Sequence, residues 1–199
     1  MKKQIGSKYV TGLNTLKERF KERHDPQNAL HKGLQGTLND LCSNMEALEV
    51  VRQTSDPQMP KDSHILNVSR VAAKLNRMTE EMRAAIAVRA EETESGLAAE
   101  MAARSGLKPG AYAPEIRARL HAMTAPEKIT AIQSLIEIKD GTTLSAIFDA
   151  PSILTGLSLE DVGRYRGQFY QATCPDLIKA RDTYRDLTEH VLAAVATVE

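Results

Sequence analysis

Residues 62–104 read DSHILNVSRVAAKLNRMTEEMRAAIAVRAEETESGLAAEMAAR, a stretch with no proline and with one glycine, Gly96. Its apolar side chains recur every three or four residues, which is the spacing of one face of an α-helix. A helix over this stretch would measure about 60 Å, against a diameter of about 26 Å for a compact 100-residue domain. Its apolar stripe therefore needs neighbouring helices, from its own chain or from other copies. The stripe comprises Ile65, Val68, Val71, Leu75, Met78, Met82, Ile86, Leu97 and Met101.

The composition also favours helices. The hydrophobic fraction of 42% and the charged fraction of 26% are typical of a globular protein, whereas aromatic residues make up only 4% and tryptophan is absent. Strands favour aromatic and β-branched side chains, and we find no clear strand or hairpin pattern. The sequence therefore predicts an all-α protein: an elongated helical bundle with one long central helix, followed by a compact cluster of short helices.

Shorter helices are predicted before the long one. Residues 8–23 form an amphipathic pattern, and Asp25 with Pro26 resembles an N-cap followed by the first residue of a second helix that ends near Arg52. Residues 54–62 contain two prolines and are predicted to form a loop.

The chain changes character after the long helix. Glycine and proline punctuate residues 106–113, so we predict a long-helix region over 1–106 and a compact multi-helix region over 107–199, or one continuous domain. Ser95-Gly96 is a candidate kink or break within the long helix. The short helices are expected at 114–123, 124–140, 142–149, 158–172 and 175–198.

Charge is distributed in blocks, although the net charge is zero. Residues 1–32 carry eight lysines or arginines against three acids, and residues 141–199 carry five against eight. The basic block could contact nucleic acid or an acidic partner, or be an ordinary solvated surface. The candidate contacts in it are Lys17, Arg19, Lys21 and Arg23.

Residues 164–170, RYRGQFY, form a second basic cluster, interleaved with aromatic side chains. Arg164 and Arg166 are candidates for contact with nucleic acid or another anionic partner, on which the aromatic rings could stack. Tyr165 and Phe169, however, are four residues apart on a helix and share one face, which is the arrangement of core residues. We favour core packing for the two rings.

We expect no catalytic residue, cofactor or metal site. No phosphate loop, nucleophile elbow or dinucleotide fingerprint is present, and the five histidines lack the spacing of a helical metal site. Cys42 and Cys174 are expected to be reduced structural thiols. No run of apolar residues approaches the roughly 18 of a membrane span, and the N-terminus lacks the apolar core of a secretion signal.

The segment Pro114–Asp161 contains PEIRARL, then APEKI, then KDGTTLSAIFDAPSILTGLS. It resembles a pattern found in uncharacterised all-helical proteins of tailed bacteriophages. The resemblance covers about a quarter of the chain, rests on capping and turn residues and carries no catalytic residue. It implies a phage context, with the protein in the virion or in the cytoplasm of the bacterial host.

These observations lead to one main hypothesis and two alternatives. We expect a non-enzymatic structural or assembly protein that binds other protein subunits, in a homo-oligomer or in a virion, through helix–helix contacts at Leu75, Met78, Met82 and Ile86. Substitution of Leu75 or Met82 by aspartate should then dissolve the assembly or unfold the chain. The first alternative is a nucleic-acid-binding helical packaging or regulatory factor, and the second is an enzyme with an unrecognised helical site.

Overall fold

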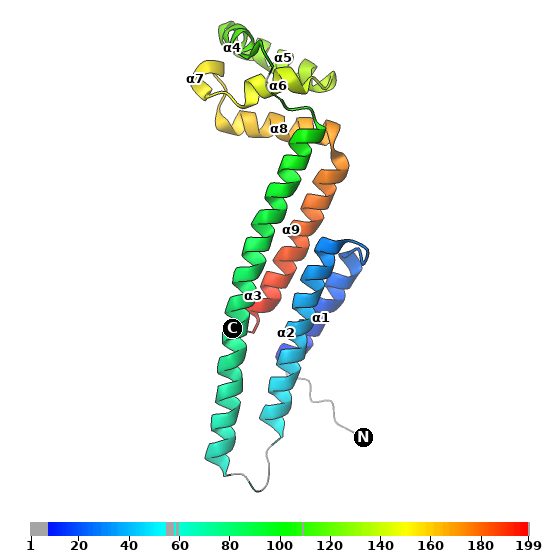
Figure 1. The fold of residues 1–199 in the computed structure, drawn as a ribbon, viewed down its shortest axis with the longest axis vertical. Helices are drawn as coiled ribbons and strands as arrows, with labels where there is room; N and C mark the ends of the chain where they lie inside the picture. Colours follow the sequence, from blue (N-terminus) through cyan, green and yellow to red (C-terminus); the bar gives the residue numbers. More distant parts are fainter. Residues whose placement is uncertain (1–7, 55–57, 59, 109, 199) are drawn as a thin grey trace. The chain divides into compact units, whose positions relative to one another are not determined.

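The computed structural model describes residues 8–54, 58, 60–108 and 110–198 (Figure 1). Within these residues all regular structure is helical and no strand occurs, which confirms the predicted all-α class with a long helix followed by shorter ones. No described helix is long and apolar enough to cross a membrane. The helices are α1 (Lys8–Arg23), α2 (Ala29–Gln53), α3 (Lys61–Arg104), α4 (Ala113–Ala122), α5 (Ala125–Glu137), α6 (Gly141–Phe148), α7 (Ser152–Thr155), α8 (Leu159–Thr173) and α9 (Pro175–Ala196).

The second helix starts later than predicted. Asn28, rather than Asp25, is the N-cap of α2, and its side chain accepts a hydrogen bond from the backbone N–H of Leu30 at 2.9 Å. The Asp25 carboxylate instead accepts the N–H of Gln27 at 2.8 Å, which closes a turn around Pro26. Aspartate caps turns and helices by the same hydrogen bond, so sequence alone did not distinguish the two positions.

Two other predicted starts are confirmed. The backbone N–H of Thr124 donates to Glu127 Oε2 at 2.8 Å at the start of α5, as a capping box requires. Ser158 Oγ accepts the N–H of Asp161 at 3.0 Å at the start of α8. The short helix α7, which holds four residues, was not predicted.

The long helix shows no break at Gly96, where a kink was considered. α3 is helical over 44 residues, from Lys61 to Arg104. One interior glycine costs a helix only about 1 kcal/mol relative to alanine, and good helix formers such as Leu97, Ala98 and Ala99 follow it.

The chain divides into two compact units that do not coincide with the regions expected from the sequence. Unit 1 comprises residues 1–92 and 182–199, and unit 2 comprises residues 93–181. The last turns of α3 therefore belong to unit 2, and most of α9 belongs to unit 1. The boundary between the predicted regions 1–106 and 107–199 was placed at glycines and prolines. These residues mark where helices end, but they do not show which helices pack together.

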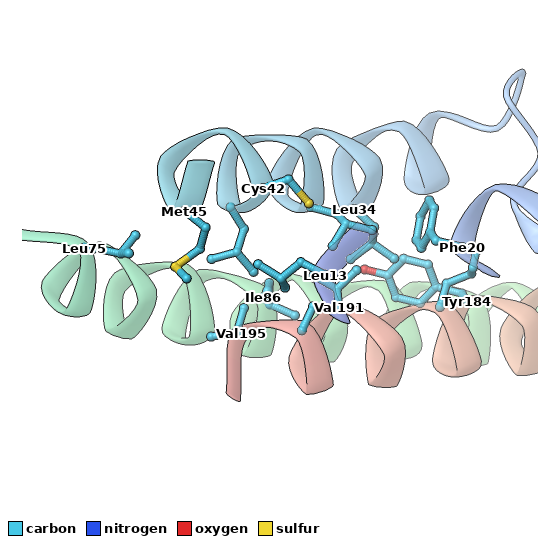
Figure 2. Packing of buried hydrophobic residues seen from close by; sticks show 14 residues of the cluster. Leu13, Phe20, Leu34, Cys42, Met45, Leu75, Ile86, Tyr184, Val191 and Val195 are labelled. Atoms are coloured by element: carbon cyan, nitrogen blue, oxygen red, sulfur yellow. The ribbon is translucent and has the colours of Figure 1, made fainter. Parts of the chain in front are cut away.

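Unit 1 packs α1, α2, α3 and α9 around one hydrophobic core (Figure 2). Every helix contributes side chains that are almost fully buried. They include Leu13 and Phe20 of α1, Leu34, Leu38 and Leu41 of α2, Leu75 and Ile86 of α3, and Tyr184, Leu187 and Val191 of α9.

Unit 2 has two smaller clusters. In one, α6 is buried along its length and packs with α4, α5 and α8. The buried side chains of this cluster are Leu120, Ile132, Leu144, Ile147, Phe148, Leu157, Tyr165 and Phe169. In the other, Met101 near the end of α3 packs with Cys174 and Leu177 at the start of α9, and Arg104 pairs with Asp176 at 2.8 Å beside them.

Candidate protein-interaction site

A groove opens in unit 1 between the end of α2 and the beginning of α3. A hollow of about 330 Å³ lies between these helices and the last residues after α9. A second hollow of about 360 Å³ shares Arg52 and Val68 with it. We call the two hollows the α2–α3 groove. Its lining consists of Met45, Leu48, Glu49, Arg52, His64, Ile65, Val68, Ser69, Ala72, Leu75, Asn76, Thr197 and Val198.

The groove lies where the seam between α2 and α3 continues past the described residues of α9. Thr197 and Val198, just beyond α9, line the first hollow, whereas the described residues that line the second belong to α2 and α3. On α3 the apolar residues continue past this point at helical spacing. As a result Ile65 is left 63% exposed at the edge of the groove, although it belongs to the apolar stripe.

Six of the thirteen residues that line the groove are polar, and two of these six pair with each other. Arg52 lies 2.9 Å from Glu49 across one helical turn. His64, Ser69 and Asn76 are spread along α3, and neither Cys42 nor Cys174 is among the described residues that line the groove. In the whole described part of the chain, no group of three His, Cys, Asp or Glu side chains is placed to hold a metal ion. The other seven lining residues are apolar, so the groove is suited to an amphipathic surface.

The four residues expected to contact other protein lie mainly inside unit 1. Leu75 and Ile86 are only 5% and 4% exposed, and Met82 packs against the same core. Met78 is half-buried. The chain's own α1, α2 and α9 thus cover the centre of the stripe, and of these four residues only Leu75 borders the groove.

The basic residues of α1 are partly paired within the chain. Lys21 forms an ion pair with Glu18 at 2.7 Å, and Arg23 forms one with Asp186 of α9 at 2.6 Å. Arg19 is exposed, and Lys17 is half-buried near Cys42.

The RYRGQFY cluster packs as the core interpretation predicted, with Tyr165 and Phe169 buried in unit 2. Arg164 pairs with Asp161 at 2.7 Å, and its guanidinium lies 4.9 Å from the centre of the Tyr165 ring. Arg166 has a structural role: it donates to the backbone carbonyl of Phe148 at 3.2 Å and pairs with Asp149 at 2.9 Å.

Arg166 is one of several cations at the carboxyl ends of short helices in unit 2. Arg117 donates to the carbonyl of Ala146 at 2.8 Å, and Lys128 donates to the carbonyl of Thr155 at 2.9 Å. These carbonyls have no partner within their helices, and the helix dipole favours positive charge there. No sequence signal identified these contacts, because each joins residues 18 or more positions apart.

No family model, curated protein or solved structure matches this chain.

Proposed function

We propose that this chain is a non-enzymatic structural or assembly protein that acts through helix–helix contacts, and that the α2–α3 groove receives a helix of its partner. The observation that carries this proposal is an apolar groove with exposed Ile65 at its edge, in line with the covered core of unit 1. Exposed apolar surface rimmed by polar groups is typical of interaction sites.

The dimensions of the groove fit a short helix of the proposed partner. Its α3 wall runs from His64 to Asn76, about 18 Å along a helix, or slightly more than three turns. An amphipathic helix of that length, with apolar residues at positions i, i+3, i+4 and i+7, would continue the packing that α9 begins. It would bury Ile65 and Val68 without displacing any described helix.

The proposed biological setting rests on the sequence and not on the groove. The resemblance of residues 114–161 to proteins of tailed bacteriophages favours a virion or a head or tail assembly component, present in the virion or in the host cytoplasm. Partners would then be other virion subunits or further copies of this chain.

A photo-crosslinking amino acid at Ser69, in the groove, tests the proposal in infected cells. We expect a discrete adduct with one protein that is lost when Ile65→Glu is added. An equivalent probe at the exposed Ser134 of unit 2, and the substitution Ile138→Glu at another exposed isoleucine, are the matched controls. If the adduct is absent, or if it persists with Ile65→Glu, the groove is not the docking site.

Nucleic-acid binding is the second candidate function, and the observation that favours it is the exposed Arg19 in the basic α1. Pairing of Lys21, Arg23, Arg164 and Arg166 with carboxylates of the chain reduces the positive charge left for phosphates. Fluorescence anisotropy with duplex DNA at low salt decides this. Binding no stronger than that of a neutral control protein would exclude it.

A further inference from the structure

The face of α3 turned away from the core of unit 1 carries both charged and large apolar side chains. Successive residues of an α-helix are rotated by about 100° about its axis, which places this face opposite Leu75, Met82 and Ile86. In Figure 1 the other helices of unit 1 lie to one side of α3. Two large apolar side chains on this face are exposed, Leu66 by 58% and Val88 by 57%. We call it the outer face of α3; its residues are Leu66, Arg70, Ala73, Arg77, Glu80, Ala84, Val88 and Glu91, all exposed.

Charge along α3 changes sign near the middle of this face. Residues 61–77 carry four lysines or arginines and one aspartate, whereas residues 80–92 carry four glutamates and two arginines. The change falls between Met78 and Thr79. Among the described residues, the outer-face charges Arg70, Arg77, Glu80 and Glu91 have no ion-pair partner, in contrast to Arg104 farther along the helix.

We propose that the outer face of α3 binds a second copy of this chain, with the two α3 helices antiparallel about a two-fold axis between residues 78 and 79. Arg77 of each copy then faces Glu80 of the other, and Ala73 faces Ala84. Leu66 comes within one helical turn of Val88 of the second copy. A two-fold axis forms each contact twice, so the interface contains two Arg77–Glu80 pairs.

The charge pattern selects this orientation. In a parallel pair Arg77 would face Arg77 and Glu80 would face Glu80, and like charges opposite one another are destabilising. In the antiparallel pair the basic half of each helix meets the acidic half of the other. Ala73 and Ala84, about 8 Å from the axis on either side, leave room for the helices to approach closely. Leu66 and Val88 supply apolar area that is exposed to water in the single chain.

Charge reversal tests the interface in sedimentation equilibrium at low salt. We expect the unaltered chain to dimerise and the dimer to weaken as salt is added. Arg77→Glu or Glu80→Arg alone should weaken the dimer by at least about tenfold, since each replaces two attractive pairs by two repulsive ones. The double variant Arg77→Glu/Glu80→Arg should return to within about threefold of the starting affinity. Arg19→Glu makes the same charge change on exposed α1 and should have no effect.

Three results would overturn the proposal: a chain that stays monomeric up to about 0.1 mM at low salt, single reversals without effect, or a double variant as weak as the single ones. Circular dichroism of each variant verifies that the helices are retained. Ile65→Glu, which blocks the α2–α3 groove, should leave this dimer intact, so the two proposals can fail independently.

Cysteine crosslinking tests the orientation. Chains with Ala73→Cys mixed with chains with Ala84→Cys should form mixed disulfide dimers faster than either forms with itself, because only those positions face each other. The native Cys42 and Cys174 are buried and should contribute little background. Faster self-crosslinking of Ala73→Cys would indicate a parallel pair and contradict the antiparallel arrangement.

Discussion

Replacing Leu75 by alanine should destabilise unit 1 far more than the same replacement at Leu66, although both leucines lie on α3. Leu75 is 5% exposed and packs in the core, whereas Leu66 is 58% exposed on the outer face. A buried Leu→Ala change costs about 2–5 kcal/mol through lost transfer energy and a residual cavity. Because Leu75 also borders the α2–α3 groove, the neighbouring side chains can relax, and we expect about 2–3 kcal/mol.

At Leu66 the expected cost is below about 0.5 kcal/mol, since more than half of the side chain is already in water. Urea denaturation at a protein concentration that keeps the chain monomeric measures both. With a slope of about 2 kcal/mol per molar urea, Leu75→Ala should lower the midpoint by about 1–1.5 M and Leu66→Ala by less than about 0.3 M. Equal shifts, or a larger shift at Leu66, would mean that the inner and outer faces of α3 are assigned wrongly.

An aspartate at position 75 should have a larger effect than alanine. It would place an unpaired charge among Met45, Leu48 and other apolar groups, and unit 1 should unfold. The sequence led us to expect either dissolved assembly or unfolding from this change. The burial of Leu75 in its own chain now favours unfolding, and the loss of helical circular dichroism by a monomeric chain would show it.

Three further predictions concern polar side chains. Burial lowers the pKa of His31 below its ordinary 6.5, partly opposed by the Asp25 carboxylate, so the unfolded chain binds more protons and stability should fall as the pH drops below 6.5. His31→Gln should flatten this part of the pH profile in urea titrations. The buried Tyr184 hydroxyl has no hydrogen-bond partner among the described residues, so Tyr184→Phe should leave the melting temperature unchanged or raise it, and a clear decrease would reveal a partner. Arg166→Ala should cost about 1 kcal/mol because it uncaps α6, whereas Arg164→Ala removes an exposed ion pair and the contact with the Tyr165 ring and should cost about 0.5 kcal/mol.

The pattern on α3 shows how far sequence could go with the candidate site. The three- and four-residue spacing of Leu75, Met82 and Ile86 identified a face that must be covered, and the structure buries it. The same spacing would result if the covering helices came from another chain. The spacing therefore could not show that α2 and α9 of the same chain cover this face. Ile65 belonged to the same stripe but is exposed, and the spacing alone did not distinguish it from the covered residues.

Arg166 shows a second limit. A basic and aromatic segment has the composition of a nucleic-acid contact, and the periodicity of Tyr165 and Phe169 correctly predicted burial. That Arg166 reaches the carbonyl of Phe148, eighteen residues earlier, depends on how α6 and α8 pack. Composition carries no information about such a partner.

What the sequence determined by itself is every described helix except α7 and most of the helix ends, because capping, proline and helical propensity act over a few residues. Thr124 with Glu127 and Ser158 with Asp161 are examples in which one local hydrogen bond selects the first turn. Tertiary structure alone decided that residues 182–198 join unit 1, which side of α3 is covered and where the groove remains open. Those outcomes depend on packing between residues far apart in the chain, and packing of that kind has no local signature.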